Sequence, residues 1–274
     1  GTRRLGLNTL LRDIEKAKSD DNIKGIYLEL SYVAAGISTI EEIREALIDF
    51  RESGKFITVY SEALSQGGYY LATAADEIYL NPVGMIEWVG LRIQNPFFKN
   101  ALDKLDVETT IIRHGKFKSA GESFSEEKFS DENSEQLQMI ITTIWQHILT
   151  NIAEIRPIDP EKLDKIADRL LLNSPEAAVS YGMADSLLYK DQVLDILKVK
   201  SGIDSSKDLR LVSLSEYTHV PAKKSYKGLA KDKIAVIYAS GEIRGGKGDE
   251  QTIGSDKFGD CIRKARKDSS VKAI

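Results

Sequence analysis

The spacing of hydrophobic positions changes several times along the first half of the chain. Apolar residues three and four positions apart predict amphipathic helices, at 7–17, 40–50, 67–75 and 137–152. Runs rich in β-branched and aromatic residues predict buried strands, at 23–30, 56–60, 77–80 and 107–113. Short strands that alternate with helices of about ten or more residues indicate an α/β fold with a parallel sheet and flanking helices.

Two element boundaries follow from local residue chemistry. Thr39 and Glu42 have the spacing of a capping box, so the second helix is expected to begin at Ile40. Asn81 and Pro82 are expected to end the third strand, because proline lacks the N–H group that a strand ladder needs.

The second half of the chain is expected to be organised differently. Residues 157–202 look wholly helical, and 213–232 are polar, lysine-rich and contain Pro221, as is typical of a linker. Residues 234–239 (IAVIYA) then predict a new buried strand. We expect this strand to pair with the first sheet, in the same chain or in a neighbouring copy.

The end of the chain repeats its beginning at an offset of 248 residues. Seven of the 21 positions in 254–274 are identical to 6–26: Gly6/Gly254, Ile14/Ile262, Lys16/Lys264, Ala17/Ala265, Asp20/Asp268, Lys24/Lys272 and Ile26/Ile274. This similarity predicts a tandem repeat of about 250 residues. Residues 1–222 would be a first repeat that lacks its first strand, and 223–274 a linker with the truncated start of a second repeat, in a fragment of a longer protein.

Composition narrows the possible functions. Hydrophobic residues make up 42% of the chain and charged residues of both signs 29%, which predicts a folded core. A net charge of −4 gives no support for a nucleic-acid partner. The single Cys261 excludes a disulfide framework or a Cys-x-x-Cys metal site, and the three scattered histidines have no metal-binding spacing. No metal or other cofactor is therefore expected.

Two glycine-containing motifs follow predicted strands. Residues 65–72 (SQGGYYLA) come after the strand at 56–60, and residues 115–120 (GKFKSA) come after the strand at 107–113. In this order and spacing, the chain resembles the signal peptide peptidase A (protease IV) family of serine proteases over essentially its whole length. The resemblance implies a fold like those of crotonase and Clp protease. It also implies peptide substrates such as signal peptides, and a homo-oligomer anchored in the bacterial inner membrane with its catalytic part on the periplasmic or extracytoplasmic side.

The resemblance also implies a catalytic dyad divided between two repeats. In the long form of the family, the first repeat supplies a lysine general base and the second repeat supplies the serine nucleophile. The lysine falls on Lys118 of this chain, whereas the serine position of the nucleophile motif falls on Gln66. We therefore expect Lys118 to be the general base, Gln66 to mark a vestigial nucleophile position, and the serine itself to lie beyond Ile274. This fragment alone is expected to be inactive.

The neighbouring residues of the first motif have structural interpretations. Ser65 is expected to be a turn or cap serine, because a shift of one residue points its side chain away from the nucleophile position. Gly67 and Gly68 are expected to allow close packing between helix and sheet, and Tyr69 and Tyr70 to belong to the core.

Two other functions remain open at this stage. A crotonase-type acyl-CoA enzyme would need paired carboxylates or an oxyanion loop after the second and third strands, and residues 31–36 and 65–68 contain no acid. A non-catalytic oligomerisation module is the other alternative.

Overall fold

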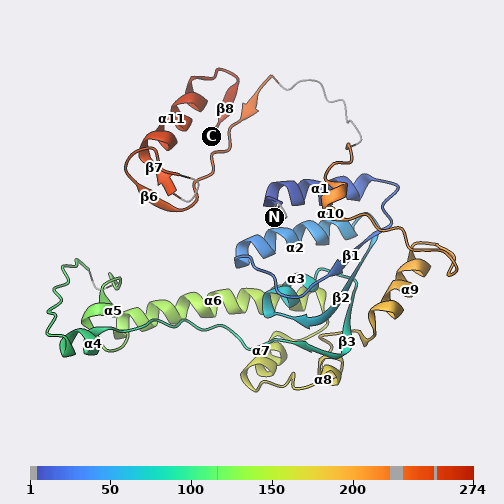
Figure 1. Cartoon of the computed structure of the whole chain (residues 1–274), viewed down its shortest axis with the longest axis horizontal. Coiled ribbons are helices and arrows are strands. Elements are labelled where there is room, and N and C mark those ends of the chain that lie inside the picture. Colours follow the sequence, from blue (N-terminus) through green and yellow to red (C-terminus); the bar gives the residue numbers. More distant parts are fainter. Residues whose placement is uncertain (1–4, 116, 223–230, 250–251) are drawn as a thin grey trace. The chain divides into compact units, whose positions relative to one another are not determined.

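The fold is taken from a computed structural model that describes residues 5–115, 117–222, 231–249 and 252–274. The chain divides into two units, Gly1–Ala222 and Lys223–Ile274 (Figure 1). Each unit is described by itself below. Residues 223–230 of the predicted linker lie outside the described residues.

The described residues form short strands and helices of very different lengths. The strands are β1 (Gly25–Glu29), β2 (Phe56–Leu64), β3 (Glu77–Ile86), β4 (Ser186–Leu187), β5 (Lys233–Ile234), β6 (Glu242–Arg244), β7 (Thr252–Gly254) and β8 (Val271–Ala273). The helices are α1 (Leu7–Ser19), α2 (Ile37–Arg51), α3 (Gln66–Ala72), α4 (Lys99–Lys104), α5 (Glu122–Ser125), α6 (Asp131–Ile155), α7 (Pro160–Asp168), α8 (Pro175–Ser180), α9 (Lys190–Lys200), α10 (Leu214–Tyr217) and α11 (Ser255–Lys267).

The first unit is built on a parallel sheet with the strand order β1-β2-β3-β4. Side chains alternate between the two faces, as the period of a strand requires. Ile57, Val59, Ile78 and Leu80 point into the larger core, which helices α1–α3 and α6–α8 share. Tyr60 and Tyr79 point to the other face, where Val193 of α9 packs on them. The predicted α/β fold with a parallel sheet is confirmed.

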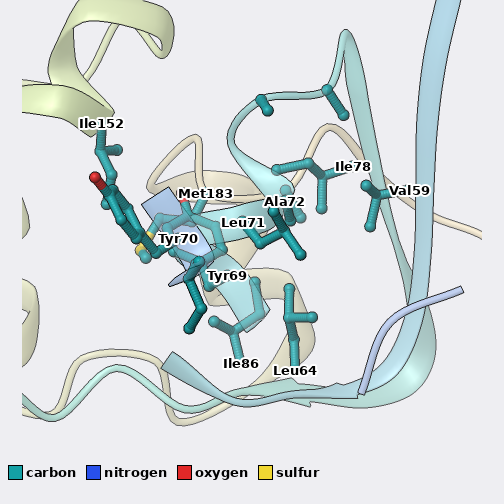
Figure 2. Packing of buried hydrophobic residues seen from close by; sticks show 14 of the residues in the cluster. Val59, Leu64, Tyr69, Tyr70, Leu71, Ala72, Ile78, Ile86, Ile152 and Met183 are labelled. Atoms are coloured by element: carbon teal, nitrogen blue, oxygen red, sulfur yellow. The ribbon is translucent and has the colours of Figure 1, made fainter. Parts of the chain in front are cut away.

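Helix α3 forms the centre of the larger core. Every residue from Gly68 to Ala72 is buried, and Tyr69 and Tyr70 are less than 2% exposed. Figure 2 shows them packed with side chains from β2, β3 and α6. Burial of one large apolar side chain stabilises a fold by about 1.5–3 kcal/mol, so this short helix is held by packing rather than by its own propensity. Tyr69 and Tyr70 are core residues, as the sequence predicted.

A buried arginine joins three helices of this core. Arg44 of α2 is 2% exposed. Its Nε donates to Thr73 Oγ1 at the end of α3 (3.0 Å), and its Nη2 donates to the backbone carbonyl of Asn151 in α6 (2.6 Å). The side-chain amide of Asn151 also donates to the hydroxyl of Tyr70 (2.8 Å). These bonds fix the C-terminal half of α6 against α2 and α3.

Two predicted boundaries are wrong. Helix α2 begins at Ile37 with Gly36 as its N-cap, and no side chain caps it, so Thr39 and Glu42 form no capping box. Strand β3 does not end at Asn81 and Pro82. Its pairing with β2 shifts there, from Ser61↔Leu80 to Ala63↔Met85, and then continues. The residues between form a bulge, in which a side chain on Gly84 would meet the carbonyl of Glu62 at 2.6 Å.

The predicted strand at 107–113 is also wrong. This segment is described, and it pairs with no strand of the described residues. Ile112 is 97% exposed. β-Propensity reflects how well a residue fits a paired and half-buried surface, and this segment has no neighbouring strand that supplies one.

Residues 157–202 are mostly helical, with one exception. Ser186 and Leu187 form β4, which pairs with Tyr79 and Leu80 at the edge of the sheet. A two-residue strand between helices has too little hydrophobic pattern to be recognised in the sequence.

The start of the predicted linker is ordered on the first unit. Tyr217 of α10 is buried against α1, and its backbone carbonyl accepts from Lys16 Nζ (2.7 Å). Thr218 Oγ1 donates to the buried carboxylate of Asp13 (2.6 Å). The chain is therefore anchored on α1 as far as Val220, whose carbonyl also accepts from Lys16.

The second unit contains two small parallel sheets, β5-β8 and β6-β7, with α11. Of the predicted strand at 234–239 only Ile234 is in a strand, and Ile234, Val236 and Tyr238 are exposed. β5 pairs with β8 of its own unit, and its pairing with the first sheet, in the same chain or in a neighbouring copy, stays a prediction. The hydrophobic pattern identified an apolar segment and did not specify its partner.

We expect Arg44→Ala to destabilise the first unit by about 2–4 kcal/mol. The change opens a cavity and leaves Thr73 Oγ1 without its buried donor. Chemical denaturation monitored by tryptophan fluorescence measures this loss. The matched control is Arg12→Ala on the exposed side of α1, which should change stability by at most about 0.5 kcal/mol. Equal stability of the two variants would contradict the role given to Arg44.

Candidate functional site

Ser65 and Gln66 of the first motif lie at the carboxyl end of β2, where α3 begins. Ser65 is the N-cap of α3, and its Oγ accepts from the N–H of Gly68 (3.2 Å). The same Oγ donates to the carbonyl of Ser31, which follows β1 (3.3 Å). A Cβ on Gly68 would meet that carbonyl at 2.8 Å. Ser65 is therefore a cap serine and Gly68 a close-packing glycine, as predicted.

Gln66 uses its whole side-chain amide to hold the segment that follows β3. Its Oε1 accepts from the N–H groups of Val89 and Gly90, both at 3.0 Å. Its Nε2 donates to the carbonyl of Gly90 (3.1 Å). An amide can make this two-way contact, whereas a serine hydroxyl is too short to reach both groups. Gln66 is therefore a structural clamp between the start of α3 and the segment after β3.

An apolar cavity of about 670 Å³ lies beside Ser65. The end of β2, residues 85–89 and residues 170–173 line it. Trp88 forms a buried wall, fixed by a bond from its indole N–H to the carbonyl of Leu163 (2.9 Å). Leu170 stands exposed in the lining, with a left-handed φ of 49° that is rare for leucine. The cavity is suited to apolar side chains, with Glu87 as the one carboxylate in its lining.

One edge of β3 beside this cavity is free of strands. β4 pairs with β3 only at Tyr79 and Leu80, so from Asn81 to Ile86 the described residues place no strand on that side. An extended peptide can hydrogen-bond to such an edge while its side chains enter the neighbouring cavity. The cavity and the edge together form a candidate peptide-binding surface.

Lys118 lies in a loop at the opposite end of α6. Its side chain is exposed, and its ammonium group has no hydrogen-bond or ion-pair partner within the described part of the chain. Its backbone N–H donates to Gly115 O (3.4 Å), and its carbonyl accepts from Arg113 Nη1 (3.5 Å). The loop ends at Glu122, a buried residue whose carboxylate accepts from Asn133 Nδ2 in the first turns of α6 (2.8 Å).

The structure does not bring Lys118 and Gln66 together. Asn133 contacts the end of the Lys118 loop, and Asn151 contacts Tyr70 of α3. Asn133 and Asn151 are 18 positions apart, which corresponds to about 27 Å of helix. Figure 1 shows α5 at one end of α6 and α3 at the other. Lys118 and the Ser65–Gln66 turn therefore cannot form one catalytic site within this unit.

A polar cluster lies where α6 meets α2. His147 and Glu41 form an exposed pair where α6 meets α2, and Asn151 also bonds to both. Over the described ranges, no group of three His, Cys, Asp or Glu side chains is placed to hold a metal ion. Among the helices in those ranges, none combines the length and apolar character of a membrane span.

Sequence reasoning missed the residues that hold these two regions in place. Val89 and Gly90 bind Gln66 through backbone groups, which leave no trace in the sequence. Glu122 lies among several acids that look alike, including Glu126, Glu127 and Asp131. The one feature of the sequence that could have identified Glu122 is its position four residues after Lys118, between Gly121 and Ser123.

We expect Gln66→Ala to free the backbone at Val89 and Gly90. Their amide hydrogens should exchange about tenfold faster, because the loss of the acceptor Gln66 Oε1 costs about 1–1.5 kcal/mol of local stability. Hydrogen exchange measured by NMR tests this, with Gln138→Ala on the exposed face of α6 as the matched control. Unchanged exchange at both amides would show that Gln66 is not a clamp.

Comparisons with known proteins agree with this architecture. Residues 49–204 match peptidase family S49. The chain is 33% identical over 270 residues to Protease 4 of Haemophilus influenzae, covering 95% of this chain and 44% of that protein. It is 30% identical over 275 residues to "Serine protease SPPA, chloroplastic" of Arabidopsis thaliana, covering 98% of this chain and 40% of that protein.

A third relative, Protease 4 of Salmonella typhi, is 33% identical over 275 residues, covering 97% of this chain and 44% of that protein. The chain thus spans less than half the length of these curated relatives. The resemblance predicted from the two motifs is confirmed, and so is the Clp-protease/crotonase-like fold, to whose superfamily these peptidases belong. The chain belongs to peptidase family S49, together with serine proteases of the protease 4 type.

Proposed function

We propose that this chain supplies the general base of a serine peptidase that degrades signal peptides, and that Lys118 is that base. The nucleophilic serine comes from a second, related unit beyond Ile274. One observation carries the proposal: Lys118 and the Ser65–Gln66 turn lie at opposite ends of α6, whose contacts with the two regions are about 27 Å apart, and Ser65 is used as a helix cap. A base in this position serves a serine from elsewhere.

The reaction would proceed through an acyl-enzyme. Lys118 Nζ, in its neutral form, takes the hydroxyl proton as the serine oxygen attacks the peptide carbonyl carbon. Backbone N–H groups stabilise the oxyanion, and the protonated amine gives its proton to the leaving nitrogen as the C–N bond breaks. Water then attacks the ester carbonyl carbon while the lysine takes its proton, and the lysine returns this proton to the serine oxygen as the C–O bond to serine breaks. Free lysine has a pKa of about 10.4, so the partner unit has to cover the exposed Lys118 and desolvate it.

The surface around Lys118 supports assembly with another unit. Large apolar side chains stand exposed over 105–139, among them Leu105, Ile112, Phe117 and Met139. Several large apolar side chains exposed in one region are typical of a surface that another protein covers. We propose that this region packs against a second unit, and that the protein is a homo-oligomer.

The second unit supports the tandem repeat. Helices α1 and α11 each have 13 residues, a glycine N-cap in an extended conformation and an aspartate C-cap with ψ of 111°. They start at Leu7 and Ser255, which keeps the offset of 248 residues found in the sequence. The relatives are more than twice as long as the aligned region, which leaves room for a complete second repeat.

The proposed setting follows the family resemblance. We propose that the full-length protein is anchored in the bacterial inner membrane and acts on peptides on the periplasmic or extracytoplasmic side. The apolar cavity beside Ser65 and the free edge of β3 suit extended, hydrophobic segments such as signal peptides. No observation favours a crotonase-type acyl-CoA enzyme, since the cavity lining offers a single carboxylate, Glu87.

We expect Lys118→Ala in the full-length protein to slow turnover of a fluorogenic leader peptide by about 10²–10⁴-fold, the usual contribution of a general base. Lys118→Arg should be almost as slow, because arginine stays protonated. The matched control is Lys104→Ala on α4, an exposed lysine whose loss should change the rate by less than about twofold. Full activity of Lys118→Ala would refute the proposal.

The isolated chain provides the second test. A fluorophosphonate probe should label the full-length protein and leave residues 1–274 unlabelled. Labelling of the isolated chain at Ser65 would show a local nucleophile. Failure of the full-length protein to react with either probe or peptide would favour a non-catalytic oligomerisation module.

A further inference from the structure

Glu122 is a buried carboxylate in a region that is otherwise exposed. Its side chain is 1% exposed, whereas Phe124 on the same short helix is 46% exposed. Burying an ionised carboxylate costs several kcal/mol unless hydrogen bonds and charges compensate it. The residues that offset the cost of burying the Glu122 carboxylate therefore indicate which parts of the fold it connects.

Four donors surround the carboxylate. Ser130 Oγ donates to Oε1 (2.6 Å), and Asn133 Nδ2 donates to Oε2 (2.8 Å). The N–H of Ser130 also donates to Oε2 (3.3 Å). Arg113 Nη1 donates to Oε1 from the other side of the Lys118 loop (3.3 Å). Desolvation would raise the pKa of Glu122, but the bonds from Ser130 and Asn133 outweigh it and hold the pKa below its usual value.

The same residues define both ends of the Lys118 loop and the start of α6. Ser130 is also the N-cap of α6, where its Oγ accepts from the N–H of Asn133 (3.2 Å). Arg113 donates to the carbonyl of Lys118 as well as to Glu122. The N–H of Glu122 donates to the carbonyl of Ser119 (2.9 Å). Two bonded steps thus connect the buried carboxylate to the backbone of Lys118.

We propose that Glu122 is the positioning residue for Lys118, which it fixes by tying Arg113 and the end of the loop to the first turn of α6. The inference rests on the proposed role of Lys118. Glu122 touches neither substrate nor nucleophile, because its carboxylate is enclosed by the donors just described. It acts by restricting where the Lys118 amine can lie relative to a rigid helix. A loop anchored on one side only would leave the amine free to sample many positions, and misplacement of a catalytic group by about 1 Å can cost 10²-fold in rate.

The first experiment measures the loop without requiring catalysis. In residues 1–274, Glu122→Gln keeps the size of the side chain and removes its charge and one acceptor. Limited trypsin digestion followed by mass spectrometry should show cleavage after Lys118 at least about tenfold faster than in the unaltered chain. Glu126→Gln, an exposed carboxylate on the same turn, is the matched control and should leave cleavage unchanged. Equal protection in both variants overturns the proposal.

Arg113→Gln is a second variant, which tests the same link if Glu122→Gln fails to fold. Arg113 is 40% exposed, so its replacement leaves the core intact while it removes the link between Glu122 and the start of the loop. Cleavage after Lys118 should again accelerate, by less than in Glu122→Gln. If Arg113→Gln is as protected as the unaltered chain, the link across the loop does not position Lys118.

The second experiment measures catalysis in the full-length protein. Glu122→Gln should lower kcat by about 10–100-fold with KM changed by less than twofold, because positioning acts on the chemical step. In the Lys118→Ala background the same change should have no further effect, since Glu122 acts only through that amine. If Glu122→Gln speeds cleavage after Lys118 but leaves kcat unchanged, Glu122 does not position Lys118 for catalysis. Full activity of Lys118→Ala instead refutes the proposed function, and the protease-protection result still decides whether Glu122 anchors the loop.

Discussion

The hydrogen bonds of one buried guanidinium determine where the rest of the first unit can lie. Arg44 binds Thr73 at the end of α3 and a carbonyl within α6, so three helices are fixed at a single point. Only the C-terminal half of α6 has buried apolar residues, Ile148, Leu149 and Ile152. The N-terminal half extends beyond this core, and everything attached to it, including the Lys118 loop, is placed by the direction that the helix takes from Arg44.

Two similar aspartate contacts fix the N-terminal ends of β2 and β3. Asp76 accepts from the N–H of Ile57 at the start of β2, and Asp185 accepts from the N–H of Ile78 at the start of β3, both at 2.7 Å. Each carboxylate is paired with an arginine, Arg51 and Arg156 respectively. The carboxyl ends of β2 and β3 align, because Leu64 pairs with Ile86. At this end of the sheet Ser65 donates to the carbonyl of Ser31, which follows β1, and ligand sites of open parallel sheets usually form at this end.

The sequence was informative where local pattern and packing agree. The helix at 67–75, the strand at 56–60 and the cap role of Ser65 could be predicted, because a buried strand followed by a short apolar helix has few alternatives. Residues 107–113 and 234–239 have equally strong β-patterns, and their failure has one cause: a strand needs a partner, and the partner is not encoded in the segment itself.

Contacts between residues distant in the chain could not be predicted from the sequence, for a related reason. Arg44 and Asn151 are 107 residues apart, and no pattern in either segment predicts their hydrogen bond. Glu122 needs donors from Arg113 and Asn133 to become a buried anchor, whereas its neighbours Glu126 and Glu127 stay exposed. The motif around Lys118 identified the candidate base, and only the structure identified what holds it.

The separation of the Lys118 loop from position 66 is built into the geometry of this unit and does not depend on the identity of residue 66 alone. A serine at position 66 would lose the three bonds that the Gln66 amide makes with Val89 and Gly90, so the segment lining the apolar cavity would loosen. Its hydroxyl would also lie at the end of α6 opposite to the loop that carries Lys118, since the contacts of α6 with the two regions are about 27 Å apart. Helix α6 is one uninterrupted element of 25 residues with no proline or glycine at which it could bend. The helix therefore keeps the loop and position 66 apart, whereas packing a second unit against the exposed loop requires no change in this one.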